Sequence, residues 1–110
     1  ENAQKRAAIV DKRLKKTTAM AADVQPPKVY GDDVPALTLV SWGSCRGPVL
    51  EAMKLLQQKG KKVRAVHFSW MYPFPADVTK KILSSNSRII DVEQNATGQL
   101  ASLIRENTCI

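Results

Sequence analysis

Apolar residues recur at helical spacing in the first part of the chain and form short runs later. Over residues 3–22 the apolar positions are mostly alanine, and lysines occupy another face, which predicts a basic helix with a narrow apolar stripe. Such a stripe gains little by burial, so we expect a solvated connecting helix rather than a ligand-binding one. Gln25-Pro26-Pro27 ends it, because proline lacks the amide donor that a helix needs. We therefore divide the chain into a basic helix and linker at residues 1–28 and a compact domain at residues 29–110.

Within the domain, residues 28–35 form a linker or a short edge strand, and strand patterns then alternate with helix patterns. The strands show little polar alternation, as expected where both faces of a sheet are covered. The order is strand, helix, strand, helix, strand, helix, at residues 36–42, 48–60, 63–68, 76–83, 88–93 and 97–106. A turn is predicted at residues 84–87. This alternation predicts an α/β fold of three αβα layers with a mostly parallel sheet, preceded by the basic helix.

Charge and composition narrow the classes of function. The net charge is +7, but residues 1–24 hold six basic against three acidic residues, the remaining charge is scattered, and no aromatic residues interleave with the basic cluster. We therefore predict no nucleic-acid partner. The apolar runs are strand-sized, so we predict no membrane partner. Cys45 and Cys109 do not form a CxxC pair, and there is one histidine, so neither a metal site nor a disulfide framework is predicted. A reducing cytoplasm is the expected location.

Ligands of open parallel sheets bind beyond the carboxyl ends of the strands, where residues 41–47, 69–75 and 93–99 are expected to converge. In the first segment, glycines precede a helix start whose free amides could bind an anion, and Arg46 could add a bidentate contact. The alternative is a tight turn in which Ser44 caps the helix. The segment matches neither a phosphate-binding Walker loop nor a GxGxxG fingerprint.

Two residues in this region have side chains that often act in catalysis, but neither has the neighbouring groups that catalysis would need. The helix dipole would favour a Cys45 thiolate, yet no base is predicted beside it, so we expect a small residue that fills the turn. His67 lies within an apolar strand, which favours a hydrogen-bonded core histidine. No catalytic residue is therefore predicted in this chain.

The other two segments have their own alternatives. Trp70, Tyr72 and Phe74 form either a hydrophobic plug or an exposed interface anchor. A carboxylate, Glu93, is followed by amide side chains that either face one cleft or only cap a helix and satisfy loop backbone, and no second carboxylate is expected to pair with Glu93. The predicted rim comprises Ser44, Arg46, Tyr72, Glu93, Asn95 and Gln99.

Three motifs, in this order and spacing, resemble those of the alpha subunit of 2-oxoacid:ferredoxin oxidoreductases, including the pyruvate and 2-oxoglutarate enzymes. They are Val40-Ser41-Trp42-Gly43-Ser44, Tyr72-Pro73-Phe74-Pro75 and Val92-Glu93-Gln94-Asn95-Ala96-Thr97-Gly98-Gln99-Leu100. The similarity covers residues 29–110 and points to the C-terminal domain of that subunit. It implies a fold like the C-terminal domain of transketolase.

The resemblance also implies what the complete enzyme does. Such enzymes decarboxylate a 2-oxoacid on thiamine diphosphate with Mg²⁺, pass electrons through iron–sulfur clusters to ferredoxin, and form an acyl-coenzyme A from the cosubstrate coenzyme A. The implied partners are the other alpha-subunit domains, the beta subunit and ferredoxin. This chain has no Gly-Asp-Gly motif and no cluster cysteines, so no cofactor-binding residue is expected in it. The implied role is a non-catalytic scaffold and subunit interface, with the rim lining the approach to the active site.

Two alternatives stay open on the sequence. The glycine-containing turn at residues 43–47 and the positive charge would also suit a free-standing α/β module that binds a nucleotide or coenzyme A. The same type of domain occurs in other thiamine diphosphate enzymes, including transketolase and the beta subunit of 2-oxoacid dehydrogenases.

Overall fold

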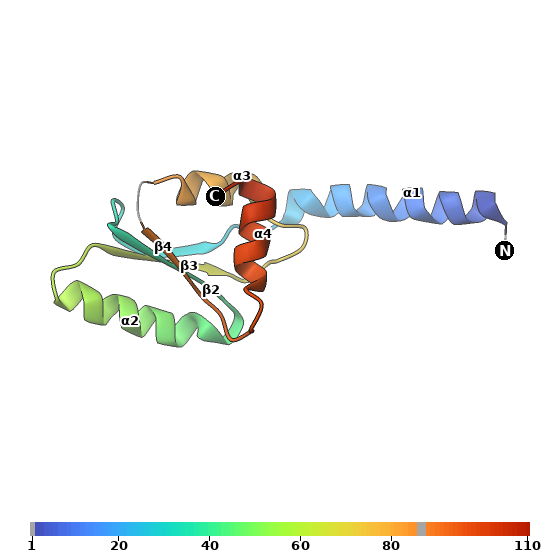
Figure 1. Cartoon of the computed structure of the whole chain (residues 1–110). Coiled ribbons are helices and arrows are strands. Elements are labelled where there is room, and N and C mark those ends of the chain that lie inside the picture. The colour runs from blue at the N-terminus through green and yellow to red at the C-terminus, as the bar shows by residue number, and fades with distance from the viewer. Residues whose placement is uncertain (1, 86–87) are drawn as a thin grey trace.

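A four-stranded mixed sheet lies between one helix on one face and two helices on the other, as Figure 1 shows for this computed structural model. The structure describes residues 2–85 and 88–110. Along the chain the elements are α1 (Ala3–Met20), η1 (Ala21–Asp23), β1 (Lys28–Gly31), β2 (Leu37–Trp42), η2 (Gly43–Cys45), α2 (Arg46–Gln58), β3 (Val63–Phe68), α3 (Ala76–Leu83), β4 (Arg88–Val92) and α4 (Gln99–Thr108). The predicted α/β fold with three layers is confirmed.

The strand order is β1-β3-β2-β4, with β2 parallel to both β3 and β4. Of the two options for residues 28–35, the structure shows the edge strand: β1 pairs with β3 antiparallel, and Lys28 lies opposite His67. β2 and β3 are inner strands, which explains their nearly continuous burial and the absence of polar alternation in their sequences.

Two hydrophobic clusters hold the layers together, one on each face of the sheet. The cluster under α2 contains Leu39, Val49, Met53, Val63 and Ala65, with Cys45 at its end. The cluster under α3 and α4 contains Val40, Val66, Phe68, Leu83, Leu100 and Ile104. Phe74 of the aromatic loop stacks on Phe68 with 5.5 Å between ring centroids, so this residue serves as the predicted hydrophobic plug.

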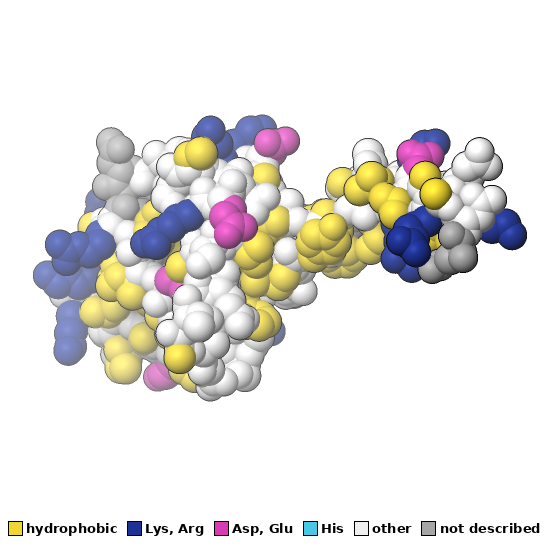
Figure 2. All heavy atoms as spheres, turned by 45° about the vertical axis from the view of Figure 1, so that its right-hand side comes forward, with side chains coloured by type: hydrophobic (Ala, Val, Ile, Leu, Met, Phe, Trp, Pro, Cys, Tyr) yellow, Lys and Arg dark blue, Asp and Glu magenta, His cyan; other side chains and the backbone are white. Residues whose placement is uncertain are grey.

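The basic helix α1 extends away from the sheet (Figure 1) and contains no buried residue. Basic side chains gather around its N-terminal end, and apolar side chains cover the neck where it joins the domain (Figure 2). The exposed Lys15 forms an ion pair with Asp11 one turn earlier, at 2.7 Å. The predicted solvated helix is thus present, although its α-helical part ends at Met20 and a short 3₁₀ turn follows. No helix among the described residues is long and apolar enough to cross a bilayer.

Several predicted boundaries were shifted. The last helix was expected to start at Thr97 but starts at Gln99, because Gly98 has a left-handed backbone with φ of 64°. The last strand ends at Val92, one residue earlier than predicted. The predicted 48–60 helix spans Arg46–Gln58, followed by Gly60 with φ of 75°. Part of the predicted turn at 84–87 lies outside the described residues.

Candidate functional site

A crevice opens where the chain changes direction across the sheet. From β2 the chain passes through α2 to β3 on one side, and then through α3 to β4 on the other side of β2. The loops that follow β2 and β4 therefore diverge, which is the position where open α/β sheets bind ligands. The crevice has a volume of about 330 Å³ and is lined by Trp42, Gly43, Ser44, Cys45, Gln94, Asn95 and Gln99. Three of the predicted rim residues, Ser44, Asn95 and Gln99, meet here.

The loops that form the crevice are joined by a side-chain bridge. The Ser44 hydroxyl donates a hydrogen bond of 2.9 Å to the Gln94 side-chain oxygen. The alternative in which Ser44 caps α2 was wrong, since the helix follows Cys45 and has no side-chain cap. The 3₁₀ turn η2 displaces Ser44 from the capping position and directs it towards the other loop.

Glu93 lies at the base of these loops and is the most heavily hydrogen-bonded side chain of the region. Its carboxylate accepts hydrogen bonds from Trp42 Nε1 at 2.9 Å and from Asn95 Nδ2 at 2.6 Å. It also accepts hydrogen bonds from the backbone amides of Leu100 and Ala101, at 2.9 and 3.2 Å, so it caps the N-terminus of α4. Glu93 therefore positions the crevice walls and is not one of the lining residues.

Asn95 combines a capping role with a place on the crevice. Its side-chain oxygen accepts hydrogen bonds from the backbone amides of Thr97 and Gln99, each at 3.2 Å. Its amide nitrogen donates a hydrogen bond to the Glu93 carboxylate. The interpretation that Asn95 satisfies loop backbone is thus correct for this residue. Gln99 is exposed at the edge of the crevice, where its side chain is available to a ligand or partner.

A second carboxyl group lies beside Glu93, contrary to the prediction. Asp91 is two residues earlier on β4, so its side chain is on the same face. Burial, followed by the hydrogen bond and repulsion from Glu93, raises the pKa of Asp91 to about 7. For Glu93, burial raises the pKa, but hydrogen bonds from Asp91, Leu100 and Asn95 outweigh it and lower the pKa to about 2. The pair therefore shares one proton, which resides on Asp91 below neutral pH.

The Asp91→Asn variant is expected to change the pH dependence of stability. Folding raises the pKa of Asp91 from 3.8 to about 7. The contribution of protonated Asp91 to the free energy of unfolding is therefore fully present below pH 4 and is lost as the pH rises through 7. Asparagine keeps a donor for Glu93 and has no charge to repel it. We expect the variant to lose less stability between pH 4 and pH 7 and to exceed the wild type by about 1 kcal/mol at pH 8. Urea unfolding at each pH measures this, with Glu106→Gln as the control for net charge.

Two predicted rim residues lie away from the crevice. Arg46, at the start of α2, donates a hydrogen bond of 2.9 Å to the Tyr30 hydroxyl and lines a second cleft. Tyr72 follows β3 in the aromatic loop and is 74% exposed. Tyr72 thus differs from Phe74, which packs against the core, and it is free to contact a partner.

The two residues with catalytic chemistry are held in structural roles. Cys45 is buried under the start of α2. His67 is buried, and its Nδ1 shares a hydrogen bond of 3.0 Å with the Ser41 hydroxyl. The predicted hydrogen-bonded core histidine is therefore confirmed.

The residues of this chain do not fit the metal centres that the family resemblance implies. Among residues 2–85 and 88–110, no group of three or more His, Cys, Asp or Glu side chains could hold a metal ion. Cys45 is buried and Cys109 is exposed, and two cysteines are too few for the usual four-cysteine ligation of an iron–sulfur cluster. No step of metal or cluster chemistry is assigned to this chain.

Comparison with known proteins adds the decisive observation. The family described as pyruvate:ferredoxin oxidoreductase core domain II matches residues 36–109. The chain belongs to this family. The matched residues include all strands of the parallel part of the sheet and both loops that form the crevice.

The relatives of this core domain II chain are alpha subunits of larger enzymes. It is 34% identical to 2-oxoacid:ferredoxin oxidoreductase 2, subunit alpha, of Aeropyrum pernix, over 91% of this chain and 16% of that protein. It is also 34% identical to the 2-oxoacid:ferredoxin oxidoreductase subunit alpha of Saccharolobus solfataricus, over 100% of this chain and 18% of the relative. The chain thus spans less than a fifth of the length of these curated relatives.

A solved structure extends the likeness to the whole core domain II chain. It is the 2-oxoglutarate:ferredoxin oxidoreductase from Magnetococcus marinus with 2-oxoglutarate, coenzyme A and succinyl-CoA bound. The TM-score is 0.84 at 28% identity, over 99% of this chain and 19% of that one. The coverage includes α1 together with the sheet, so the extended helix is part of the shared arrangement.

Sequence reasoning missed three residues of the site. Trp42 lines the crevice and binds Glu93, Gln94 bridges to Ser44, and Asp91 shares a proton with Glu93. Asp91 could have been found, because a carboxylate two positions before Glu93 on a predicted strand must lie on the same face. The contacts of Trp42 and Gln94 join residues about fifty positions apart, and no local pattern indicates them.

Proposed function

We propose that this chain is a non-catalytic domain of the alpha subunit of a 2-oxoacid:ferredoxin oxidoreductase and serves as a scaffold and subunit interface. The observation that carries the proposal is the structural likeness to the Magnetococcus marinus enzyme, which extends over nearly all of this chain but a fifth of that one. In this proposal, residues 1–28 are a connecting helix and linker, and residues 29–110 are the domain.

The proposal assigns the crevice rim to contacts with the rest of the enzyme. Ser44 and Gln99 are exposed and Asn95 is half-buried, so their outer atoms remain accessible. Glu93 does not line the crevice and accepts a hydrogen bond from the Asn95 side chain. The exposed Tyr72 would anchor a neighbouring surface. We propose that these residues contact other alpha-subunit domains or the beta subunit and line the approach to the active site.

The apolar stripe of α1 supports the same role. Ile9, Val10 and Leu14 are 51%, 49% and 64% exposed, although a solvated helix gains nothing from them. Leu14, Val10, Ala7 and Ala3 also line a shallow groove along the helix. We propose that the remaining part of the alpha subunit covers this stripe, because a helix of this kind is stable in water mainly when its apolar side is packed.

The proposal leaves the chemistry to other parts of the complete enzyme. Thiamine diphosphate, Mg²⁺ and the iron–sulfur cluster would be bound elsewhere, with coenzyme A as cosubstrate and ferredoxin as electron acceptor. The solved Magnetococcus marinus relative has coenzyme A and succinyl-CoA bound, which supports this assignment of the cosubstrate. A cytoplasmic location is proposed, since two unpaired cysteines suit a reducing compartment.

The isolated chain is expected to lack both catalysis and cofactor affinity. We expect no detectable 2-oxoacid-dependent reduction of ferredoxin and no heat of binding when thiamine diphosphate and Mg²⁺ are titrated by calorimetry. The reason is that the described residues contain no group of three or more His, Cys, Asp or Glu side chains that could hold the Mg²⁺ of the cofactor. Tight, magnesium-dependent binding of thiamine diphosphate to this chain alone would contradict the proposal.

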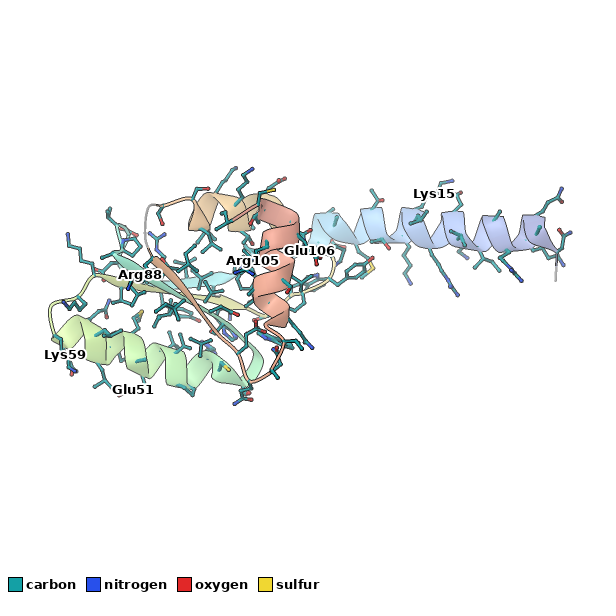
Figure 3. All side chains as sticks on the ribbon, viewed as in Figure 1. Lys15, Glu51, Lys59, Arg88, Arg105 and Glu106 are labelled. Carbon is teal, nitrogen blue, oxygen red and sulfur yellow. The ribbon has the colours of Figure 1, made fainter. Side chains whose placement is uncertain are left out.

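The interface role is tested in the complete alpha–beta enzyme. Gln99→Trp places a large side chain on the exposed rim, so it is expected to leave the isolated chain stable to within about 0.5 kcal/mol. In the complex it is expected to lower the yield of assembled enzyme or its ferredoxin reduction about fivefold, because overpacked interfaces cost about 1 kcal/mol or more. Glu51→Trp, on the outer side of α2 (Figure 3), is the control. Equal losses from both variants would contradict a role specific to the rim.

A further inference from the structure

A second cleft lies at the same end of the sheet, beyond the ends of β2 and β3. It has a volume of about 480 Å³ and is lined by Lys28, Trp42, Gly43, Arg46, His67, Phe68, Ser69 and Met71. This size is within the range of small-molecule sites. Three of these eight lining residues are basic (Lys28, Arg46 and His67), and none of the eight is acidic. The cleft therefore gathers positive charge that the lining itself does not neutralise.

The basic groups come from three different elements and are held in place. Lys28 of β1 is opposite His67 of β3 in the antiparallel register, so both side chains are on the same face of the sheet. Arg46 approaches from the first residue of α2 and lies over the Tyr30 ring, 5.7 Å from its centroid. The Tyr30 hydroxyl accepts a hydrogen bond from Arg46 at 2.9 Å. Arg46 is thus oriented by an uncharged partner and keeps its full charge for a ligand.

The positive charge in the cleft also affects the pKa of His67. The charged groups that face it are Arg46 from α2 and Lys28 from β1, while Ser41 of β2 supplies an uncharged hydroxyl. Burial, and then the charges of Arg46 and Lys28, lower the pKa of His67. An anion between these groups would reverse the last two effects, which links its binding to protonation of His67.

Apart from Gly43 and the exposed Ser69, the remaining lining residues of the cleft are apolar or aromatic. Trp42 contributes a half-buried indole ring and Met71 an adaptable thioether, whereas the Phe68 side chain is buried and stacks on Phe74. Arginine recognises phosphate through parallel N–H donors, and lysine adds a point charge. The combination suits a ligand with a phosphate group at one end and an apolar or planar group at the other.

We propose that this cleft binds a phosphate ester, with the phosphate between Lys28, Arg46 and His67 and the organic group against Trp42 and Met71. This site shares Trp42 and Gly43 with the crevice between β2 and β4, but its basic residues are separate from Ser44, Asn95 and Gln99, to which the interface role is assigned. A negative result here leaves the assignment to the alpha subunit unchanged, because that assignment is tested with Gln99 and with thiamine diphosphate.

The test uses the single histidine of the chain as a reporter inside the cleft. Inorganic phosphate, phenyl phosphate and phenol are titrated into the full chain at low ionic strength while the His67 imidazole resonances are followed by NMR. We expect saturable shifts with both phosphates and none with phenol. Phenyl phosphate is expected to bind about fivefold more tightly than inorganic phosphate, because its ring is buried against the apolar wall. Equal affinities would contradict an organic ester as the ligand.

Matched variants locate the site. Arg46→Gln and Lys28→Gln alter exposed side chains, and each is expected to weaken phenyl phosphate binding about fivefold or more. Lys59→Gln removes the same charge at the far end of α2 (Figure 3) and is expected to keep the wild-type affinity. The proposal is overturned if the His67 resonances do not respond to the phosphates, or if Lys59→Gln weakens binding as much as Arg46→Gln. Amide spectra of each variant confirm that it is folded.

Discussion

Replacing Glu93 with alanine is expected to lower the free energy of unfolding by about 3 kcal/mol. The carboxylate accepts hydrogen bonds from Trp42 and Asn95 and from two backbone amides at the start of α4. Alanine would leave these donors without their partner and would remove a negative charge from the positive end of the helix dipole. Urea unfolding followed by far-UV circular dichroism measures the loss.

Two further variants separate the site of Glu93 from general effects of charge. Glu93→Gln keeps the shape but directs an amide group at the donors, so an intermediate loss of about 2 kcal/mol is expected. Glu106→Ala removes an exposed carboxylate of α4 (Figure 3) and should cost no more than about 0.5 kcal/mol. In the Glu93 variants the indole N–H resonance of Trp42 should shift. An unchanged indole resonance together with a loss below 1 kcal/mol would show that Glu93 does not hold the loops.

Replacing Gly31 with alanine is expected to cost about 3 kcal/mol. Gly31 ends β1 with φ of 92°, and a Cβ there would lie 2.4 Å from the Val63 carbonyl oxygen and 2.8 Å from Met53 Sδ. Both neighbours belong to the packed layer between α2 and the sheet, and the carbonyl cannot move without disturbing the edge pairing. Thermal and urea unfolding measure the effect.

Gly43 is the matched control for this substitution. It also has a positive φ, 59°, but a Cβ there would meet nothing within 4 Å. Gly43→Ala is therefore expected to cost only about 1 kcal/mol of backbone strain. If the two alanine variants were equally stable, the close approach at Gly31 would not be a source of destabilisation.

Local sequence patterns were sufficient for most of the elements. The inner strands and α2 could be predicted because their burial is regular: both faces of β2 and β3 are covered, and one side of α2 packs on the sheet. Boundaries at the loop after β4 were less accurate. There the start of α4 depends on the left-handed Gly98 and on capping by Glu93, which is six residues before the helix.

For the candidate site, the sequence determined which residue types end the strands, and the resemblance in three motifs identified the family that the comparisons then showed. The tertiary structure decided how those residues are grouped. Because β3 and β4 lie on opposite sides of β2, Ser44, Asn95 and Gln99 meet in one crevice, while Arg46 faces another cleft with Lys28 and His67. Such grouping depends on strand order and on contacts between distant residues, and neither leaves a periodic signal in the chain.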